Sequence, residues 1–88
     1  MRRVIFSGTS EGKTLCRQLS QAGLQAEVCV ATEYGKEGMP ELRGITVHTG
    51  RMTTPQMTEF LRGANIVIDA THPYAVEVSK NIRAACAQ

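Results

Sequence analysis

The sequence predicts an α/β fold in which a parallel sheet of about four strands carries helices on both faces. Short apolar runs of strand length alternate with segments whose apolar residues recur at helical spacing, in the order βαβ(α)βαβα. The 88 residues also suffice for one small domain with a modest core. Because strands that alternate with helices pair in parallel through right-handed crossovers, we expect a Rossmann-like arrangement over residues 1–88.

The first third of the chain predicts two strands and the helix between them. Val4–Phe6 is an uninterrupted apolar run, which is typical of a central strand covered on both faces. A helix is predicted from about Ser10 to Ala22, with Gly23 just past its end. The stretch Ala26–Ala31 then predicts the second strand.

The middle of the chain predicts less regular structure. Two early glycines and Pro40 between Thr32 and Gly44 argue against a full helix, so a short helical turn is the most that we predict there. Ile45–His48 alternates apolar and polar residues, which favours a strand exposed on one face at the edge of the sheet. His48 alternates outward on this strand, and we assign it no role.

A second clear helix is predicted after Thr53. Either Thr54 caps it with Pro55 in the first helical position, or Thr53 and Gln56 form a capping box. The apolar residues that follow lie on one face of a helix: Met57, Phe60, Leu61 and Ala64.

The last part of the chain predicts a strand and a helix. Ile66–Ile68 is continuous and apolar, which predicts a second central strand. A helical stripe begins near Tyr74 and consists of Ala75, Val78, Ile82 and Ala85. Placing the alternating strand at the periphery gives the strand order 3-2-1-4, which leaves the apolar fourth strand at an edge. Because an unpaired apolar edge favours aggregation, we interpret the chain as part of a longer protein.

Composition narrows the classes of function. The formal net charge is +2 with mixed signs along the chain, and no basic run predicts nucleic-acid binding. Cys16, Cys29 and Cys86 are widely separated and lack metal-ligand spacing, so we expect no metal site and interpret them as core residues of a reduced, cytoplasmic protein. The apolar stretch near the amino terminus is too short for a signal peptide or a membrane span.

The first candidate site is the run of small residues between the first strand and the first helix, Ser7–Gly12. Helix N-termini present unpaired backbone N–H groups and favour negative charge, and glycines let a phosphate approach the backbone. The dinucleotide fingerprint has glycine at the positions of Ser7, Thr9 and Gly12, so the match is degenerate. The segment predicts either a phosphate site or an ordinary strand-to-helix turn.

The second candidate site is the segment Asp69–Tyr74, which follows the fourth strand and should face the first site where the strand order reverses. His72 either donates a hydrogen bond or proton to a ligand, or stabilises a turn before Pro73. Asp69 either orients a neighbour or binds a ribose, or satisfies nearby backbone N–H groups. Tyr74 either lines the site or begins the last helix.

Residues after the second and third strands bear on the choice of cofactor. Glu33 lies 21 positions after Gly12, close to the spacing at which an acidic residue binds the adenosine ribose of NAD. Thr32 would instead tolerate a phosphate, and Arg51 after the third strand could reach one. Glu33 can equally be a solvated loop acid.

Four motifs together resemble the precorrin-6A reductases, which include the cobalt-precorrin-6A reductases of cobalamin biosynthesis. They occur in family order over essentially the whole chain, and one position departs from the family pattern, because Ser7 stands where glycine is usual. The motifs are Ser-Gly-Thr-Ser-Glu-Gly at 7–12, Ala-Thr-Glu-Tyr-Gly at 31–35, Gly-Arg at 50–51 and Ile-Asp-Ala-Thr-His-Pro-Tyr-Ala at 68–75.

The resemblance implies the amino-terminal part of an enzyme that transfers hydride from a nicotinamide nucleotide to a corrin-ring precursor, a tetrapyrrole. It implies a second, carboxyl-terminal α/β domain that closes over the cleft. The alternative is a non-catalytic nucleotide-binding or interaction module, and a reading frame that continues into a second α/β pattern would decide for the enzyme.

The resemblance also implies roles for individual residues. The family includes users of NADPH and of NADH, so the resemblance leaves the cofactor open, whereas the argument from Thr32 and Arg51 favours NADPH. His72 is the obvious proton donor in this part, while ring nitrogens, water or the second domain could serve instead. The family motif places Thr71, His72 and Tyr74 where nicotinamide and macrocycle meet, and it places Gly8, Thr9, Ser10, Glu11 and Gly12 at the cofactor phosphates.

Overall fold

The computed structural model describes residues 1–8, 10–31, 41–71 and 76–87. Four strands and three helices lie in these ranges, and the short helical turn predicted between Thr32 and Gly44 falls largely outside them. The elements are β1 (Arg3–Ser7), α1 (Ser10–Gln21), β2 (Ala26–Val30), β3 (Ile45–Thr49), α3 (Thr54–Phe60), β4 (Ile66–Ala70) and α4 (Val76–Cys86).

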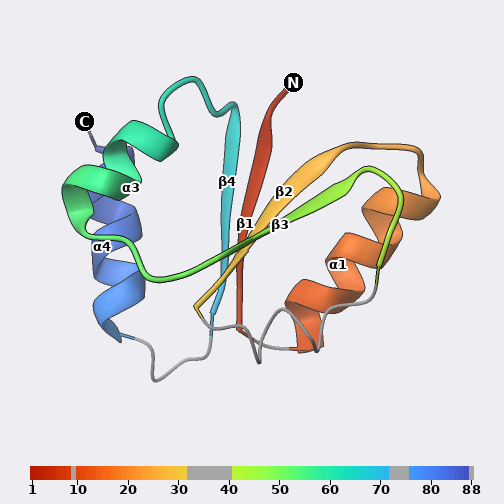
Figure 1. The fold of residues 1–88 in the computed structure, drawn as a ribbon, viewed down its shortest axis with the longest axis horizontal. Helices are drawn as coiled ribbons and strands as arrows, with labels where there is room; N and C mark the ends of the chain where they lie inside the picture. The colour runs from red at the N-terminus through yellow and green to blue at the C-terminus, as the bar shows by residue number, and fades with distance from the viewer. Residues whose placement is uncertain (9, 32–40, 72–75, 88) are drawn as a thin grey trace.

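The four strands form one parallel sheet in the order β3-β2-β1-β4, which confirms the predicted order (Figure 1). β3 and β4 are the two edges of this sheet. The expectation that the apolar fourth strand is central was wrong, because among the described strands β4 pairs only with β1 and Ile66 at its start is 40% exposed. The pairing is in register from Arg3 opposite Ile66 to Ser7 opposite Ala70.

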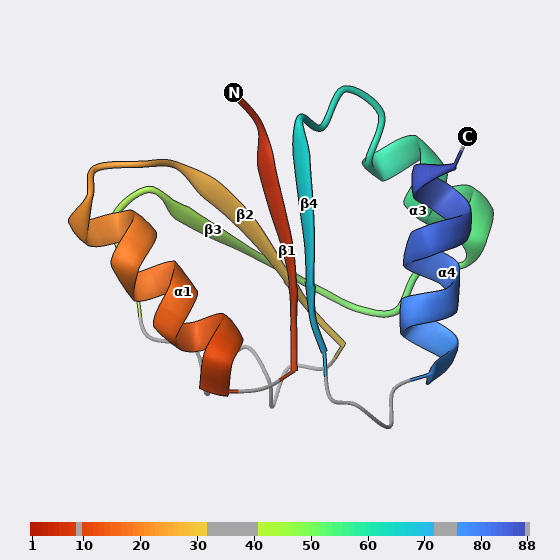
Figure 2. The ribbon, with the colours of Figure 1, turned by 180° about the vertical axis from the view of Figure 1, so that it is seen from behind.

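The helices cover both faces of the sheet, as predicted. α1 lies on one face, and α3 and α4 lie together on the other (Figures 1 and 2). Successive residues of β1 therefore enter different cores: Val4 and Phe6 pack with residues of α3 and α4, whereas Ile5 packs with Cys16 of α1. Val4 and Ile5 have no exposed surface, which makes β1 the central strand.

Three strands extend further than the apolar runs indicated. β1 includes Arg3 and Ser7, and β4 continues through Asp69 and Ala70, because parallel pairing between these strands does not require apolar side chains. An apolar run predicts that the strand ends at its last apolar residue. In the structure, the strand ends where its hydrogen bonds to the neighbouring strand end.

The helix boundaries also refine the predictions. Thr53 is the N-cap of α3 and forms the capping box with Gln56, which decides between the two predicted caps. α3 ends at Phe60, so the helical stripe predicted to reach Ala64 was too long, although Leu61 and Ala64 still pack in the core. α4 begins at Val76, and its predicted start at Tyr74 lies outside the described residues.

The cysteine prediction holds for two of three residues. Cys16 and Cys29 are buried, and burial raises the pKa of the Cys29 thiol to about 12, so this thiol is inert at neutral pH. Cys86 at the end of α4 is exposed, so its interpretation as a core residue was wrong. It is the last residue of the helix, past the apolar stripe that faces the sheet.

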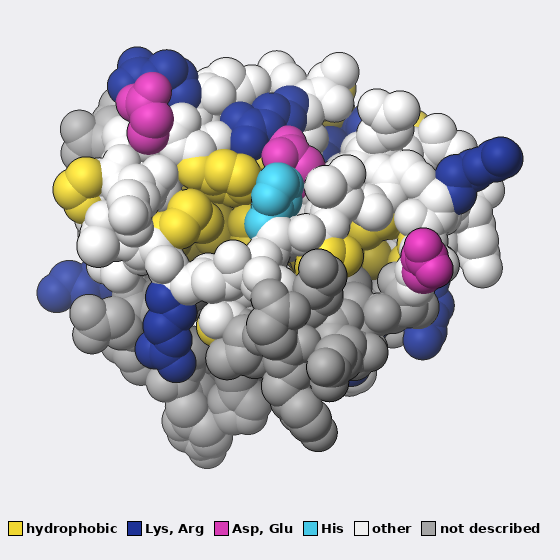
Figure 3. All heavy atoms as spheres, viewed as in Figure 1, with side chains coloured by type: hydrophobic (Ala, Val, Ile, Leu, Met, Phe, Trp, Pro, Cys, Tyr) yellow, Lys and Arg dark blue, Asp and Glu magenta, His cyan; other side chains and the backbone are white. Residues whose placement is uncertain are grey.

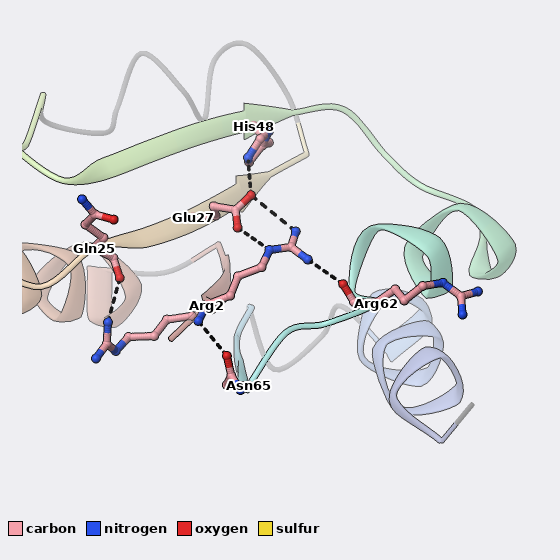
Figure 4. A network of polar contacts seen from close by, with 7 residues as sticks. Arg2, Gln25, Glu27, His48, Arg62 and Asn65 are labelled. Atoms are coloured by element: carbon pink, nitrogen blue, oxygen red, sulfur yellow. Dashed lines mark hydrogen bonds and ion pairs between the residues drawn. The ribbon is translucent and has the colours of Figure 1, made fainter.

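A polar network links Arg2, which precedes β1, to β2 and β3 (Figure 4). Arg2 Nε donates to Glu27 Oε2 at 2.6 Å, and His48 Nε2 donates to Glu27 Oε1 at 3.0 Å. The Arg2 guanidinium lies 4.9 Å from the centre of the Phe60 ring, and the His48 ring meets that ring edge-on at 5.2 Å. The His48 side chain is 40% exposed on the edge strand, and it makes structural contacts that the alternation of the strand did not predict.

On this face of the molecule, a histidine, an acidic side chain and basic side chains lie together beside apolar ones (Figure 3). The hydrogen bond from Arg2, with a smaller contribution from His48, lowers the pKa of Glu27 against the opposing effect of partial burial. Glu27 thus stays ionised and links Arg2, which precedes β1, to His48 on β3.

We predict that Glu27→Gln destabilises the chain by about 1 kcal/mol at pH 7, because a charge-assisted, partly buried hydrogen-bond network is lost. Since the folded-state pKa of Glu27 is lowered, its contribution is present above the unfolded pKa and is lost as the pH falls through the folded pKa. Urea unfolding from pH 7 down to pH 3 measures this, and the difference from wild type should shrink at the acidic end.

Glu59→Gln is the matched control. Glu59 pairs with Arg62 at 2.9 Å, but both side chains are more than 70% exposed, so its loss should change stability by only a few tenths of a kcal/mol. Equal effects of the two substitutions would contradict a structural role for the network.

Candidate functional site at the carboxyl edge of the sheet

The carboxyl ends of the four strands meet at one edge of the sheet. Ser7 lies opposite Ala70, and Val30 lies opposite Thr49, so the residues that follow these strands emerge side by side. Gly8 N donates to the Ala70 carbonyl oxygen at 3.2 Å, which extends the pairing of β1 and β4 by one step. The two candidate segments predicted to face each other are thus joined by a hydrogen bond.

The start of α1 lies directly against the end of β1. Gly12 is buried, and a Cβ atom added to it would lie 2.4 Å from Ser7 Oγ and 3.0 Å from Ser7 Cβ. A side chain at position 12 therefore competes with the side chain at position 7. This close approach brings the unpaired N–H groups of the first helical turn to the edge of the sheet.

A second polar cluster lies at the end of β4. Thr71 donates to Asp69 Oδ1 twice, from its backbone N at 3.1 Å and from its hydroxyl at 2.5 Å. The Thr71 hydroxyl also lies 3.3 Å from the Ser79 hydroxyl, which comes from α4. Partial burial opposes ionisation of Asp69, but hydrogen bonds from Ser79 and Thr71, with Arg83 nearby, lower its pKa.

The structure brings several predicted site residues to this edge. Gly8, Ser10 and Glu11 are exposed at the junction of β1 and α1, and Gly12 is buried behind them. The Gly8 N–H already donates to the Ala70 carbonyl oxygen. Gly8 therefore gives a ligand space to approach, because it has no side chain, but not a hydrogen-bond donor. Thr71 is partly buried at the end of β4, and Arg51 is exposed just after β3.

The remaining predicted site residues lie outside the described ranges. These are Thr9, Thr32, Glu33, His72 and Tyr74. Their assignments stay predictions from the sequence.

Two residues at this edge gain importance from the structure. Asp69 was weighed but left out of the predicted site, and Ser79 was not considered. The available signal for Ser79 was a polar residue three positions before Ile82, on the stripe of α4 that faces the core. Sequence spacing alone could not show that this hydroxyl reaches Thr71.

Little in the described part of the chain supports a metal site, a membrane span or a ligand site at the other edge of the sheet. It contains no cluster of three or more metal-ligating side chains, and none of its helices is long and apolar enough to cross a bilayer. A hollow of about 540 Å³ lies at the opposite, amino edge of the sheet. Arg2 and Glu27 in its lining already neutralise each other, so the carboxyl edge remains the better candidate.

Comparison with known proteins identifies the family. The family model of precorrin-6x reductase CbiJ/CobK matches residues 3–88. The chain belongs to this family. It corresponds to the amino-terminal part of these reductases.

Members of the reductase family from several organisms resemble the chain along its length. It is 40% identical over 85 residues to the cobalt-precorrin-6A reductase of Salmonella typhimurium, covering 94% of this chain and 32% of that protein. It is 33% identical over 90 residues to the precorrin-6A reductase of Rhodobacter capsulatus, covering 99% of this chain and 35% of that protein. The chain therefore spans about a third of the length of these reductases.

A solved structure confirms the fold. The CobK precorrin-6A reductase structure superimposes with a TM-score of 0.81 at 30% sequence identity, covering 100% of this chain and 34% of that one. The parallel sheet with order 3-2-1-4 is thus shared with the reductase family.

We predict that Gly12→Ala destabilises the domain by about 1–3 kcal/mol, because the added methyl group overpacks against Ser7. In a Ser7→Gly background the same substitution should cost clearly less, since the atoms it would meet are gone. Urea denaturation of the wild type, both single variants and the double variant measures the coupling energy. An equal cost of Gly12→Ala in both backgrounds would show that the two positions do not compete.

Proposed function

We propose that this chain is the cofactor-binding part of a precorrin-6A or cobalt-precorrin-6A reductase and binds a nicotinamide dinucleotide at the carboxyl edge of its sheet. The observation that carries the proposal is the hydrogen-bonded junction of β1 and β4, which brings the segment leading into α1 to the same edge of the sheet as Thr71. Ligands of open parallel sheets bind at this edge, where the strand order reverses.

The residues at the edge suit the two ends of such a cofactor. The first turn of α1 offers backbone N–H groups and a partial positive charge to a pyrophosphate, with Gly8, Thr9, Ser10, Glu11 and Gly12 around it. Exposed Gly8 leaves room for close approach of phosphate to the backbone. When bound, the nicotinamide supplies the hydride that a reductase delivers.

The substrate side of the proposal rests on the family. The named relatives are reductases of precorrin-6A or cobalt-precorrin-6A, so we propose a corrin precursor as the substrate of the whole enzyme. His72 and Tyr74 would meet the macrocycle, with His72 as proton donor. A second domain would complete the cleft, consistent with relatives that are about three times as long. The free thiols of the three cysteines suit a reducing, cytoplasmic setting.

We propose NADPH as the preferred cofactor. Arg51 is exposed directly after β3, the strand beside β2, whose carboxyl end would receive the adenosine. A guanidinium there can pair with a 2′-phosphate, and Thr32 would tolerate one, whereas Glu33 would favour the hydroxyl of NADH.

Titration of the 88-residue chain with NADPH or NADH, followed by backbone amide shifts in NMR, tests the site. We expect weak binding, because the proposed second domain is missing and the ligand stays hydrated. Shifts should concentrate at residues 7–14, 32–35 and 69–74. Residues 25–27 and 44–46 at the opposite edge are the internal control and should not move.

Shifts at the amino edge, or none at millimolar ligand, would contradict the proposed site. We also expect that the chain alone reduces no precorrin-6A-type substrate. Measurable turnover by the chain alone would show that the described fold holds the complete active site.

Arg51→Ala tests cofactor choice. If Arg51 binds the 2′-phosphate, the substitution should weaken NADPH binding by about 1–3 kcal/mol and leave NADH binding nearly unchanged. Arg43→Ala is the matched control, since it removes the same charge just before β3, at the other edge of the sheet. Equal weakening of both cofactors by Arg51→Ala, or equal effects of the two variants on NADPH, would rule out phosphate recognition by Arg51.

A further inference from the structure

The hydrogen bonds around Thr71 fix the direction in which its hydroxyl group points. A carboxylate can only accept, and Thr71 Oγ1 lies 2.5 Å from Asp69 Oδ1, so the Thr71 hydroxyl proton lies between them. A bond of this length to an ionised carboxylate is much stronger than a contact between neutral hydroxyls. The 3.3 Å contact with Ser79 therefore cannot draw the proton away from Asp69.

The same geometry fixes the role of Ser79. Because the proton of Thr71 is committed, Ser79 can only donate in its contact with Thr71 Oγ1. The Ser79 hydroxyl has one proton, and it points toward the Thr71–Asp69 pair. The backbone N–H of Thr71 is likewise held by Asp69, at 3.1 Å.

The Thr71 hydroxyl can then accept a hydrogen bond from a ligand, but it cannot donate one. A phosphate or carboxylate group is also an acceptor, and it would in addition meet the negative charge of Asp69, which is exposed. A ligand N–H or O–H group would instead find two acceptors side by side. The end of β4 therefore has the opposite preference to the start of α1, where backbone N–H groups favour an anion.

We propose that Asp69 and Ser79 are positioning residues that hold Thr71 as a hydrogen-bond acceptor, so that it binds an N–H or O–H group of the nicotinamide nucleoside. This inference rests on the proposed binding of a dinucleotide at the carboxyl edge. The donor is either the carboxamide N–H of nicotinamide or a hydroxyl of its ribose. The cofactor phosphates are excluded from this position.

Three ligands separate these cases in the 88-residue chain: NADPH, its reduced 3-acetylpyridine analogue, which lacks the amide N–H, and ADP, which has a diphosphate but no nicotinamide nucleoside. We expect Thr71→Val to weaken NADPH binding about 5–10-fold, as for one neutral hydrogen bond, and to leave ADP binding unchanged. Thr71→Ser keeps the hydroxyl and should restore NADPH binding. Thr58→Val on α3 is the control for the substitution itself.

The analogue identifies the donor. If the carboxamide donates, the wild type should prefer NADPH to the analogue by a similar factor, and Thr71→Val should abolish that preference. If a ribose hydroxyl donates, Thr71→Val should weaken both equally. Equal weakening of ADP and NADPH would show that Thr71 binds phosphate, and unchanged binding of NADPH would show that Thr71 binds no part of it; either result overturns the proposal.

Asp69→Asn tests the positioning role through the affinity for NADPH relative to the affinity for ADP. The asparagine amide can donate to Thr71 Oγ1 and fill its lone pair. We expect this variant to lose NADPH affinity with little change for ADP, whereas a purely structural defect would weaken both ligands. Ser79→Ala should act in the same direction with a smaller effect, and Ser79→Thr should restore binding.

A ligand-free measurement keeps the inference separate from the proposed function. By NMR, the Thr71 hydroxyl proton should exchange with water more slowly than that of exposed Thr46, and Asp69→Ala should abolish the difference. Exchange as fast as that of Thr46 in the wild type would overturn the positioning role even if NADPH binds. A slow Thr71 proton in a chain that binds no dinucleotide would instead refute the proposed function, and with it the ligand assigned to Thr71.

Discussion

The parallel pairing of β1 with β4 is the interaction on which the candidate site depends. It holds Ser7 opposite Ala70 and continues through the bond from Gly8 N to the Ala70 carbonyl oxygen. Both strands are followed by segments with polar groups that could bind a ligand. A shift of one residue in this register would move these two segments apart and would turn the side chains of the shifted strand to the other face of the sheet. Because β1 is fully buried at Val4 and Ile5, such a shift would also expose the core. The core therefore fixes the geometry of the edge.

The two ends of the molecule use polar groups in different ways. At the amino edge, Arg2 donates to Glu27, which also accepts a hydrogen bond from His48 further along β3. At the carboxyl edge, Asp69 accepts two hydrogen bonds from Thr71, and α1 begins with N–H groups that have no partner within the helix. The paired charges thus lie toward the amino edge, and the groups proposed to bind a ligand lie at the carboxyl edge.

The sequence was a good guide to the fold and a partial guide to the site. Continuous apolar runs identified β1 and β4, alternation identified the edge strand β3, and placing that strand at the periphery gave the strand order. Strand ends, the end of α3 and the environment of Cys86 were missed, because ladders and burial depend on neighbours that are distant in sequence. The contact of Ser79 with Thr71 and the role of His48 were missed for the same reason. The spacing of a motif gives the positions of its residues along the chain, but it does not show which way a hydroxyl group points.

Ser7 links the stability of the fold to the site. The serine side chain fills the space that a Cβ on Gly12 would enter. A side chain at one position leaves no room for one at the other unless Ser7 or α1 shifts. In this chain position 7 carries it, so Gly12 is required by packing as well as by any approach of phosphate to the helix. Loss of binding in a Gly12 variant thus has two physical explanations, and only the Ser7→Gly background, which removes the steric one, can distinguish them.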